Sequence, residues 1–270
     1  MKKEKRFFVR TITEAATQLG IKVEWGFGDW ICRLEKNGKH QFIYGYNFPI
    51  NSAISFEIAK DKTATSYFLN QKKIEAVEHE IFMKPELTDF LEKDQSVEAI
   101  LKRANQWGYP IVCKDNRGTG GNNVFKVEND SELKQALSDI WSVSRAAALS
   151  PFYDIENEYR FFILDTKIQF GYKKIKSEDE WKFNLNRGGE AEVINIDDFP
   201  DITKNILDAV HELNLRVCSV DVIKLKNENK FLILEVNTGI CTEYFSQTSQ
   251  EAQKLSQDLY SNILKKMFEE

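Results

Sequence analysis

The pattern of apolar and polar positions predicts an N-terminal block of helix, hairpin and helix. Apolar residues at helical spacing predict a helix over Thr11–Leu19. Two runs rich in β-forming residues flank Asn37-Gly38, and this dipeptide favours the tight turn of a hairpin. One or two helices then fill Asn51–Asn70, with a break near Lys60-Asp61-Lys62. We expect residues 1–60 to form a small, separate element.

The rest of the pattern alternates helices with strands and predicts an α+β fold. In the middle third it predicts helices over Ser96–Trp107 and Asp130–Ile140, and strands over Tyr109–Lys114, Asn123–Val127 and Arg145–Ser150. In the final third it predicts hairpins Glu158–Leu164 with Lys167–Tyr172 and Val217–Leu225 with Lys230–Val236, and helices Pro200–Leu213 and Ser249–Met267.

Composition and charge narrow the function. Of the 270 residues, 42% are hydrophobic and 29% charged, which is typical of a globular protein. The net charge of −5 argues against a general nucleic-acid binder or a protein that binds anionic membranes. No apolar run approaches the ~18 residues of a membrane span, and the charged N-terminus lacks the apolar core of a secretion signal. The four cysteines and three histidines are too scattered for a zinc site, so we expect free thiols and a cytoplasmic location.

A glycine-rich turn separates two predicted strands in the middle third. Its sequence, Gly118-Thr119-Gly120-Gly121, is neither the dinucleotide fingerprint nor a P-loop, because both of those motifs open a helix. Consecutive glycines let backbone N–H groups converge on a phosphate. Lys114, four residues earlier, adds a positive charge suited to phosphate. The alternative is a plain hairpin turn beside a surface lysine.

The last predicted hairpin carries side chains with oxygen atoms. Glu235 and Asn237 are two residues apart on one strand, so their side chains share a face. Asp221 lies close to Glu235 if the strands pair across Lys226–Asn229. Two carboxylates and an amide are ligands that suit Mg²⁺. The flanking residues are apolar, where unpaired carboxylates are costly. The alternative is an ordinary polar face of a hairpin.

In this order, the motifs resemble those of the ATP-grasp superfamily in its carboxylate–amine ligase branch, which includes D-alanine–D-alanine ligase, glutathione synthetase, a ribosomal-protein glutamate ligase and cyanophycin synthetase. Asp61-Lys62 resembles the Asp-Lys that begins the first nucleotide-binding helix, and Ile111–Lys114 is similar to the Val-Val-Lys-Pro strand. Asn157–Arg160 resembles the segment that opens the second lobe, and Asn184–Gly189 resembles an Asn-x-x-Arg-Gly-Gly stretch. The region before Lys62 is shorter than the usual N-terminal domain.

The resemblance implies two α+β lobes, residues 61–148 and 149–270, that grip ATP behind a short N-terminal α/β element, residues 1–60. It implies an enzyme that forms an amide or peptide bond through an acyl phosphate, with Mg²⁺, a small-molecule or peptide carboxylate and an amine, and it allows a homodimer. The implied ATP ligands are Lys62, Lys114, Gly118, Thr119, Gly120, Gly121, Ala148, Leu149, Ser150 and Lys173. The implied metal ligands are Asp221, Glu235 and Asn237, and the implied catalytic residues are Arg160 and Arg187.

Several alternatives stay open on the sequence. Lys173 is the candidate phosphate ligand, but Lys174 is next to it and adjacent strand residues face opposite ways. An ATP-grasp kinase acting on a small alcohol, or an ATP-binding module without turnover, also fits the motifs. The histidines receive no role, and the five tryptophans are expected to be packing residues because they follow no stacking pattern.

Overall fold

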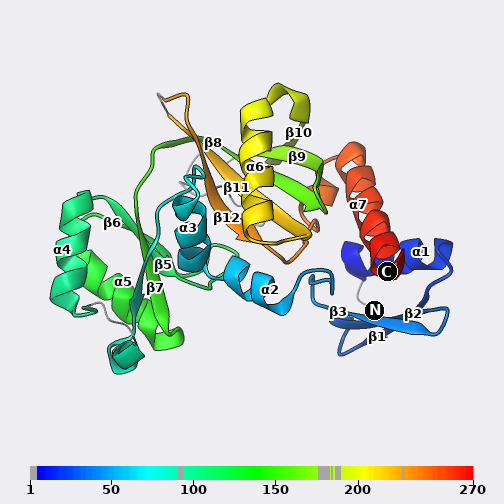
Figure 1. Ribbon diagram of the computed structural model, residues 1–270, viewed down its shortest axis with the longest axis horizontal. Helices are drawn as coiled ribbons and strands as arrows, with labels where there is room; N and C mark the ends of the chain where they lie inside the picture. Colours follow the sequence, from blue (N-terminus) through cyan, green and yellow to red (C-terminus); the bar gives the residue numbers. More distant parts are fainter. Residues whose placement is uncertain are drawn as a thin grey trace.

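A computed structural model describes residues 5–90, 94–175, 183, 185, 190–226 and 228–269. The described strands form three antiparallel sheets, one of three, one of four and one of five strands. Figure 1 shows the four-stranded sheet at one end of the molecule, the three-stranded sheet at the other and the five-stranded sheet between them. The mixed helix and sheet predicted from the sequence is confirmed.

The N-terminal sheet has the order β1-β2-β3, and the helix α1 (Phe7–Gln18) precedes it. Its strands are β1 (Lys22–Gly26), β2 (Ile31–Lys36) and β3 (Lys39–Tyr44). The predicted hairpin turns at Asn37-Gly38, where φ is +51° and +76°. Side chains that alternate along β2 and β3, such as those of Leu34 and Ile43, are buried in the same core as α1.

Two short helices, α2 (Ala53–Lys60) and α3 (Lys62–Gln71), lead from this element to the four-stranded sheet. The break between them falls at Asp61, whose Oδ1 accepts a hydrogen bond from Ala64 N at 2.8 Å and so caps α3. The four-stranded sheet has the order β4-β7-β5-β6. Its elements are β4 (Glu80–Met83), η1 (Pro85–Phe90), α4 (Val97–Trp107), β5 (Ile111–Asp115), β6 (Val124–Val127), α5 (Asp130–Val143) and β7 (Ala146–Pro151).

The five-stranded sheet has the order β10-β9-β8-β11-β12, with α6 (Pro200–Glu212) packed on it. Its strands are β8 (Ile155–Leu164), β9 (Lys167–Ile175), β10 (Glu190–Ile194), β11 (Val217–Leu225) and β12 (Phe231–Asn237). The chain ends with η4 (Phe245–Gln247) and α7 (Gln250–Glu269), and η3 (Ile196–Asp198) precedes α6. The segment before β4 runs beside β12, where Val77 N donates to Ile233 O at 2.8 Å.

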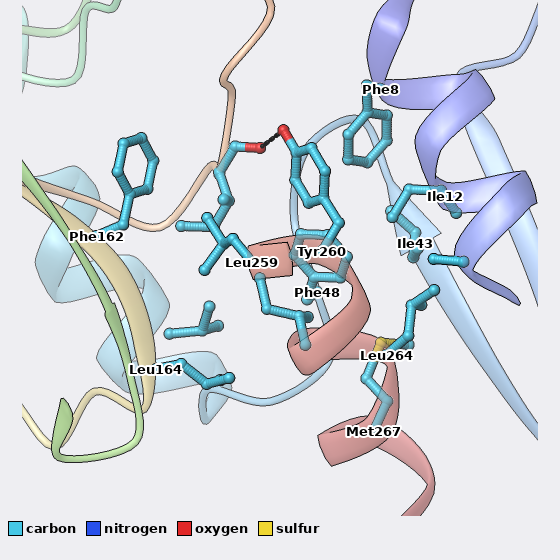
Figure 2. Packing of buried hydrophobic residues seen from close by; sticks show 14 of the residues in the cluster. Phe8, Ile12, Ile43, Phe48, Phe162, Leu164, Leu259, Tyr260, Leu264 and Met267 are labelled. Carbon is cyan, nitrogen blue, oxygen red and sulfur yellow. Dashed lines mark hydrogen bonds between the residues drawn. The ribbon is translucent and has the colours of Figure 1, made fainter. Parts of the chain in front are cut away.

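The largest core joins the two ends of the chain. Figure 2 shows α7 with Tyr260 packed between Phe8 of α1 and the five-stranded sheet, which contributes Phe162 and Leu164. The ring centroids of Phe8 and Tyr260 are 5.1 Å apart, and Tyr260 Oη donates to Ile240 O at 3.0 Å. The N-terminal element therefore shares its core with the C-terminal helix. The three-part division into residues 1–60, 61–148 and 149–270 remains a prediction, and its second boundary falls within β7.

None of the described helices has both the length and the apolar character that crossing a membrane requires.

Candidate functional site

Two cavities meet between the four- and five-stranded sheets. The first has a volume of about 190 Å³ and is lined by the glycine-rich turn, β5, the end of β7 and the facing strands β8, β11 and β12. The second has a volume of about 580 Å³ and is lined by α2, the N-terminal element and the turn after β12. The residues that line both cavities are Lys62, Gly118, Thr119, Gly120, Arg160, Lys174, Phe183 and Glu235.

The start of α3 is fastened to the end of β5, and this contact positions Lys62. Lys62 N donates to Asn116 O at 3.2 Å, and the Thr63 N and Oγ1 atoms donate to Asn116 Oδ1 at 3.1 and 2.9 Å. Lys62 Nζ donates to Gly118 O at 2.7 Å. The lysine predicted from the Asp-Lys pair is thus in direct contact with the glycine-rich turn.

The glycine-rich turn depends on backbone conformations that favour glycine. Gly120 and Gly121 have φ of +69° and +72°, in the left-handed region. A Cβ atom at Gly118 would lie 2.9 Å from the Asp115 Cβ, so the turn passes close to the end of β5. Asp115 Oδ1 accepts from Arg117 N at 3.0 Å and from Ser144 Oγ at 2.8 Å, which fixes this end of β5. Lys114, one residue earlier, lines the first cavity and is 6% exposed.

On the other side of the cavities, three neighbouring strands bring charged residues into register. Asp221 on β11 lies opposite both Arg160 on β8 and Glu235 on β12. Arg160 Nε and Nη2 donate to the two Asp221 oxygens at 2.6 and 2.5 Å, and Lys174 Nζ lies 3.1 Å from Asp221 Oδ1. Asn237 Nδ2 donates to Glu235 Oε1 at 3.1 Å and to Asp221 Oδ2 at 3.4 Å. Of the three predicted metal ligands, Asn237 therefore lies within hydrogen-bonding distance of both carboxylates, which occupy paired positions on β11 and β12.

A comparison with models of protein families shows to which family the chain belongs. Residues 59–259, well over half of the chain, match the model of a RimK-like ATP-grasp domain. The chain belongs to the RimK-like ATP-grasp family. The match includes every residue described above at the two cavities' shared border, and it confirms the superfamily inferred from the motifs.

Relatives of this ATP-grasp chain are named as ligases. A probable alpha-L-glutamate ligase of Shewanella loihica is 24% identical over 211 residues, covering 77% of this chain and 65% of the relative. A protein of the same name from Methanococcoides burtonii is 24% identical over 194 residues, covering 71% and 60%. The chain thus spans about 60–65% of the length of these two relatives.

Solved ATP-grasp structures share the fold at low sequence identity. A D-alanine–D-alanine ligase of Bacillus anthracis, complexed with ATP, aligns with a TM-score of 0.59 at 19% identity, covering 81% of this chain and 68% of that one. A bifunctional glutathione synthetase of Pasteurella multocida aligns with a TM-score of 0.63 at 14% identity, covering 98% and 44%. These likenesses confirm the predicted ATP-grasp fold.

The buried charges of the ATP-grasp domain compensate one another. Burial alone would raise the pKa of Asp221, but the charges of Arg160 and Lys174 outweigh burial and hold that pKa well below its usual range. Glu158 also forms an ion pair with Lys174. Burial raises the pKa of Glu158, with the nearby Asp221 adding to the effect and Lys174 opposing it. Removing Lys174 would leave the buried Glu158 without this ion pair, which is strongly destabilising.

Lys114 is a buried cation of the first cavity on the side of β5. Its pKa is lowered to about 8, mainly by burial; Glu235 and Glu158 oppose the decrease, and the charge of Lys62 adds to it. A ligand with negative charge in this cavity would favour the protonated form of Lys114. On the side of the four-stranded sheet, the positive charges of Lys62 and Lys114 are therefore suited to an anionic ligand.

Three predicted site residues are placed differently from expectation. Lys174, and not Lys173, lines both cavities, because Lys173 points to the other face of β9 where its register partners are Tyr159 and Glu192. Ala148 and Leu149 are fully buried in β7 between β4 and β5 and do not line the first cavity. The chain reaches that cavity from Ser150 onward, through Pro151, Phe152 and Tyr153.

Some predicted residues lie outside the described part of the chain, and some residues at the cavities were not predicted. Arg187 and most of Asn184–Gly189 lie outside the described residues. The sequence leaves the choice between Lys173 and Lys174 open, although the alternation of Phe170, Tyr172 and Lys174 on one face of β9 is a signal that Lys174 faces inward. The N-terminal element also lines the second cavity through Trp30, Tyr46 and Asn47, a contribution that the sequence did not predict. Trp30, expected as a packing residue, is 41% exposed.

Proposed function

We propose that the protein is an ATP-dependent carboxylate–amine ligase that works through an acyl phosphate. The observation that carries this proposal is the set of residues common to the two cavities, which includes Lys62, Arg160, Lys174 and Glu235. A terminal phosphate held at this border would face whatever binds in the larger cavity. Two substrates can then meet across one charged boundary, as a phosphoryl transfer between them requires.

The first cavity is suited to ATP. Lys62, Lys114 and the glycine-rich turn offer positive charge and backbone N–H groups to the phosphates. Apolar side chains farther along the same cavity offer a surface for the base. These are Val112, Ile155, Ile223 and Leu234. The expected role of Ala148 and Leu149 passes to the segment from Ser150 to Tyr153.

The donor set fits a Mg²⁺ ion bound together with ATP. Among the described residues, no group of three or more His, Cys, Asp and Glu side chains is placed to hold a metal ion. Mg²⁺, however, is commonly bound by one or two carboxylates together with waters and phosphate oxygens. Glu235 and Asn237 would supply protein ligands. Both oxygens of Asp221 accept hydrogen bonds from Arg160, so Asp221 would join them only by giving up part of this pairing. When bound, the ion would reduce the negative charge of the phosphates.

The chemistry follows from this arrangement. A carboxylate oxygen of the acid substrate attacks the terminal phosphorus of ATP, and ADP leaves. The amine nitrogen then attacks the acyl carbon, loses a proton and releases phosphate, which leaves an amide. Arg160 and Lys174 line both cavities, so their charges are placed to stabilise the acyl phosphate and the oxyanion formed in the second step. The substrate class is an amino acid or peptide.

Hydroxylamine trapping tests the proposal. Purified protein, Mg-ATP and hydroxylamine are incubated with a panel of amino acids and short peptides, and hydroxamates are sought by mass spectrometry. We expect an ATP-dependent hydroxamate that the Glu235→Gln variant does not form. The matched control is Glu190→Gln, which changes an exposed carboxylate on β10 of the same sheet and should retain activity.

Two outcomes would overturn the ligase proposal. A phosphorylated alcohol without any hydroxamate would establish the kinase alternative. ATP binding by calorimetry, with neither product formed across the panel, would indicate a binding module instead.

A further inference from the structure

The second cavity has a charged end and an aromatic end. Its described charged lining residues are Lys60, Lys62, Arg117, Arg160, Lys174 and Glu235. Four of these six also line the first cavity, and Lys60 and Arg117 lie on the side of α2 and the glycine-rich turn. The walls formed by Trp30, Tyr46 and Asn47 and by the turn after β12 instead present rings and neutral groups. The rings are those of Trp30, Tyr46, Tyr244 and Phe245.

Trp30 is held in place although much of its surface is exposed. Gly45 N donates to Trp30 O at 2.8 Å, and a Cβ atom at Gly45 would lie 2.8 Å from the Trp30 Cζ2. The indole ring therefore packs against a backbone that must be glycine, all the more because Gly45 has a φ of +58°. Tyr44 and Tyr46 approach the indole edge-on, with centroid distances of 6.2 and 6.1 Å.

The guanidinium group of Arg6 also supports the Trp30 ring. The Arg6 guanidinium carbon lies 5.5 Å from the centroid of the Trp30 ring and 5.6 Å from that of Tyr46. Arg6 also donates to Tyr46 Oη at 3.3 Å and to Asp29 O. The side chain of Trp30 is thus fixed on one side by Gly45, Arg6 and two tyrosines, while 41% of its surface stays exposed.

A rigid, exposed aromatic ring at a cavity wall is suited to recognition. Burying an aromatic surface against another ring contributes to binding, and a ring that is already ordered loses little conformational entropy when the ligand arrives. A charged side chain placed against this wall would lose water, and Trp30, Tyr46, Tyr244 and Phe245 offer no ionic partner in return. Of the cations near this wall, Arg6 is already engaged by Tyr46 and Asp29.

We propose that Trp30 is a specificity-determining residue, and that one of the two substrates is an aromatic amino acid or a peptide ending in one. The substrate's carboxylate or amine would point to Arg160 and Lys174, and its ring would pack against Trp30, with Tyr46 and Tyr244 on the same side of the cavity. This inference rests on the proposed ligase function. It separates this chain from the relatives named as glutamate ligases, because a glutamate side chain would meet aromatic and neutral groups at this wall.

The experiment compares aromatic and acidic ligands in wild-type protein and in variants of Trp30. Equilibrium dialysis with a non-hydrolysable ATP analogue measures binding of phenylalanine, glycyl-phenylalanine and phenylalanyl-glycine against their glutamate counterparts. We expect an aromatic ligand to bind at least about tenfold more tightly than its glutamate counterpart, and Trp30→Ala to weaken it about tenfold, as the loss of an aromatic contact of ~1.5 kcal/mol implies. Trp30→Phe should restore most of the affinity.

The controls separate this inference from the ligase proposal. Phe27→Ala removes a ring of the same turn that is 84% exposed and lines neither cavity, so it should leave binding unchanged. The ATP dissociation constant should stay the same in Trp30→Ala, because Trp30 does not line the first cavity.

Each result decides one question. If no aromatic ligand binds more tightly than its glutamate counterpart, or if Trp30→Ala binds as wild type does, the inference about Trp30 is wrong even when hydroxamates form. If aromatic ligands bind through Trp30 but no hydroxamate forms, the specificity stands and the ligase proposal fails.

Discussion

At the scale of single residues, burial disfavours the charged form of Lys114, and a bound anion would favour it. Its pKa is lowered from the usual 10.5 to about 8 because it is buried beside Lys62. In the unfolded chain the lysine keeps its proton up to about pH 10.5, so the unfolded state binds more protons between pH 8 and 10.5. Folding stability attributable to Lys114 is therefore lowest below pH 8 and rises as the pH increases through this window.

The substitution Lys114→Met tests this dependence of folding stability on pH. The destabilisation by charged Lys114 corresponds to about 3 kcal/mol below pH 8, so the free energy of unfolding of wild type should rise relative to the variant between pH 8 and 10.5. Urea denaturation of both proteins across this range measures the difference. ATP affinity should change in the opposite direction, falling in wild type above pH 8 as Lys114 loses its proton. A difference in unfolding free energy that does not vary with pH would show that Lys114 carries no such burial cost.

Individual site residues show how much of the candidate site could be predicted from the sequence. Asp221, Glu235 and Asn237 could be brought together from the two-residue period of strands and the hairpin between them. For Lys173 and Lys174, the alternation of Phe170, Tyr172 and Lys174 favours Lys174 as the inward-facing lysine, but this pattern is short and lies beside the register shift between Phe162 and Ile163. The packing of β9 against its neighbours makes Lys174 the buried lysine.

At the scale of elements, β8 and β9 pack so closely that one position accepts no side chain. Gly171 on β9 lies opposite Phe161 on β8, and a Cβ atom there would lie 2.8 Å from Phe161 Cδ1 and 3.3 Å from Ile194 Cδ1. Phe161 is fully buried and has little freedom to move. Gly171→Ala should therefore destabilise the protein by ~1–3 kcal/mol through overpacking.

A second glycine provides the matched control for this prediction. Gly26 also lies in a strand, without a positive φ, and a Cβ atom there would meet nothing within 4 Å. Gly26→Ala should leave stability unchanged or slightly raise it. Chemical denaturation of the two variants tests the pair, and equal effects would show that the contact with Phe161 relaxes freely.

The elements that the sequence analysis missed share a position in the fold. The helices and strands with strong periodicity, such as α4, α6 and the pair β11–β12, lie within a few residues of their predicted bounds. The missed strands β4 and β10 are four and five residues long, and each is an edge strand of its sheet. A short edge strand has one neighbour and few buried side chains, so its sequence has little alternation to detect.

At the scale of the whole molecule, the N-terminal element is attached to the chain segment after β12 that lines the second cavity. Glu243, six residues after Asn237, accepts hydrogen bonds from Phe7 N and Phe8 N at 3.0 and 3.1 Å. It thereby caps α1, which has no side-chain cap of its own. Tyr46 Oη lies 3.5 Å from the same carboxylate. One side chain thus joins α1, the aromatic wall of the second cavity and the turn after β12.

The substitution Glu243→Ala should affect binding in the second cavity but not in the first. Loss of the cap should lower the free energy of unfolding by ~1–2 kcal/mol. The wall that carries Trp30 and Tyr46 should lose its position, so KM for the amino acid or peptide substrate should rise. The ATP dissociation constant should not change, because no residue of the N-terminal element lines the first cavity. Glu14→Ala, which changes an exposed acid on α1, is the control. Denaturation, substrate kinetics and ATP titration of the two variants measure these effects, and an equal loss of ATP affinity in Glu243→Ala would mean that α1 supports the whole site rather than its substrate side alone.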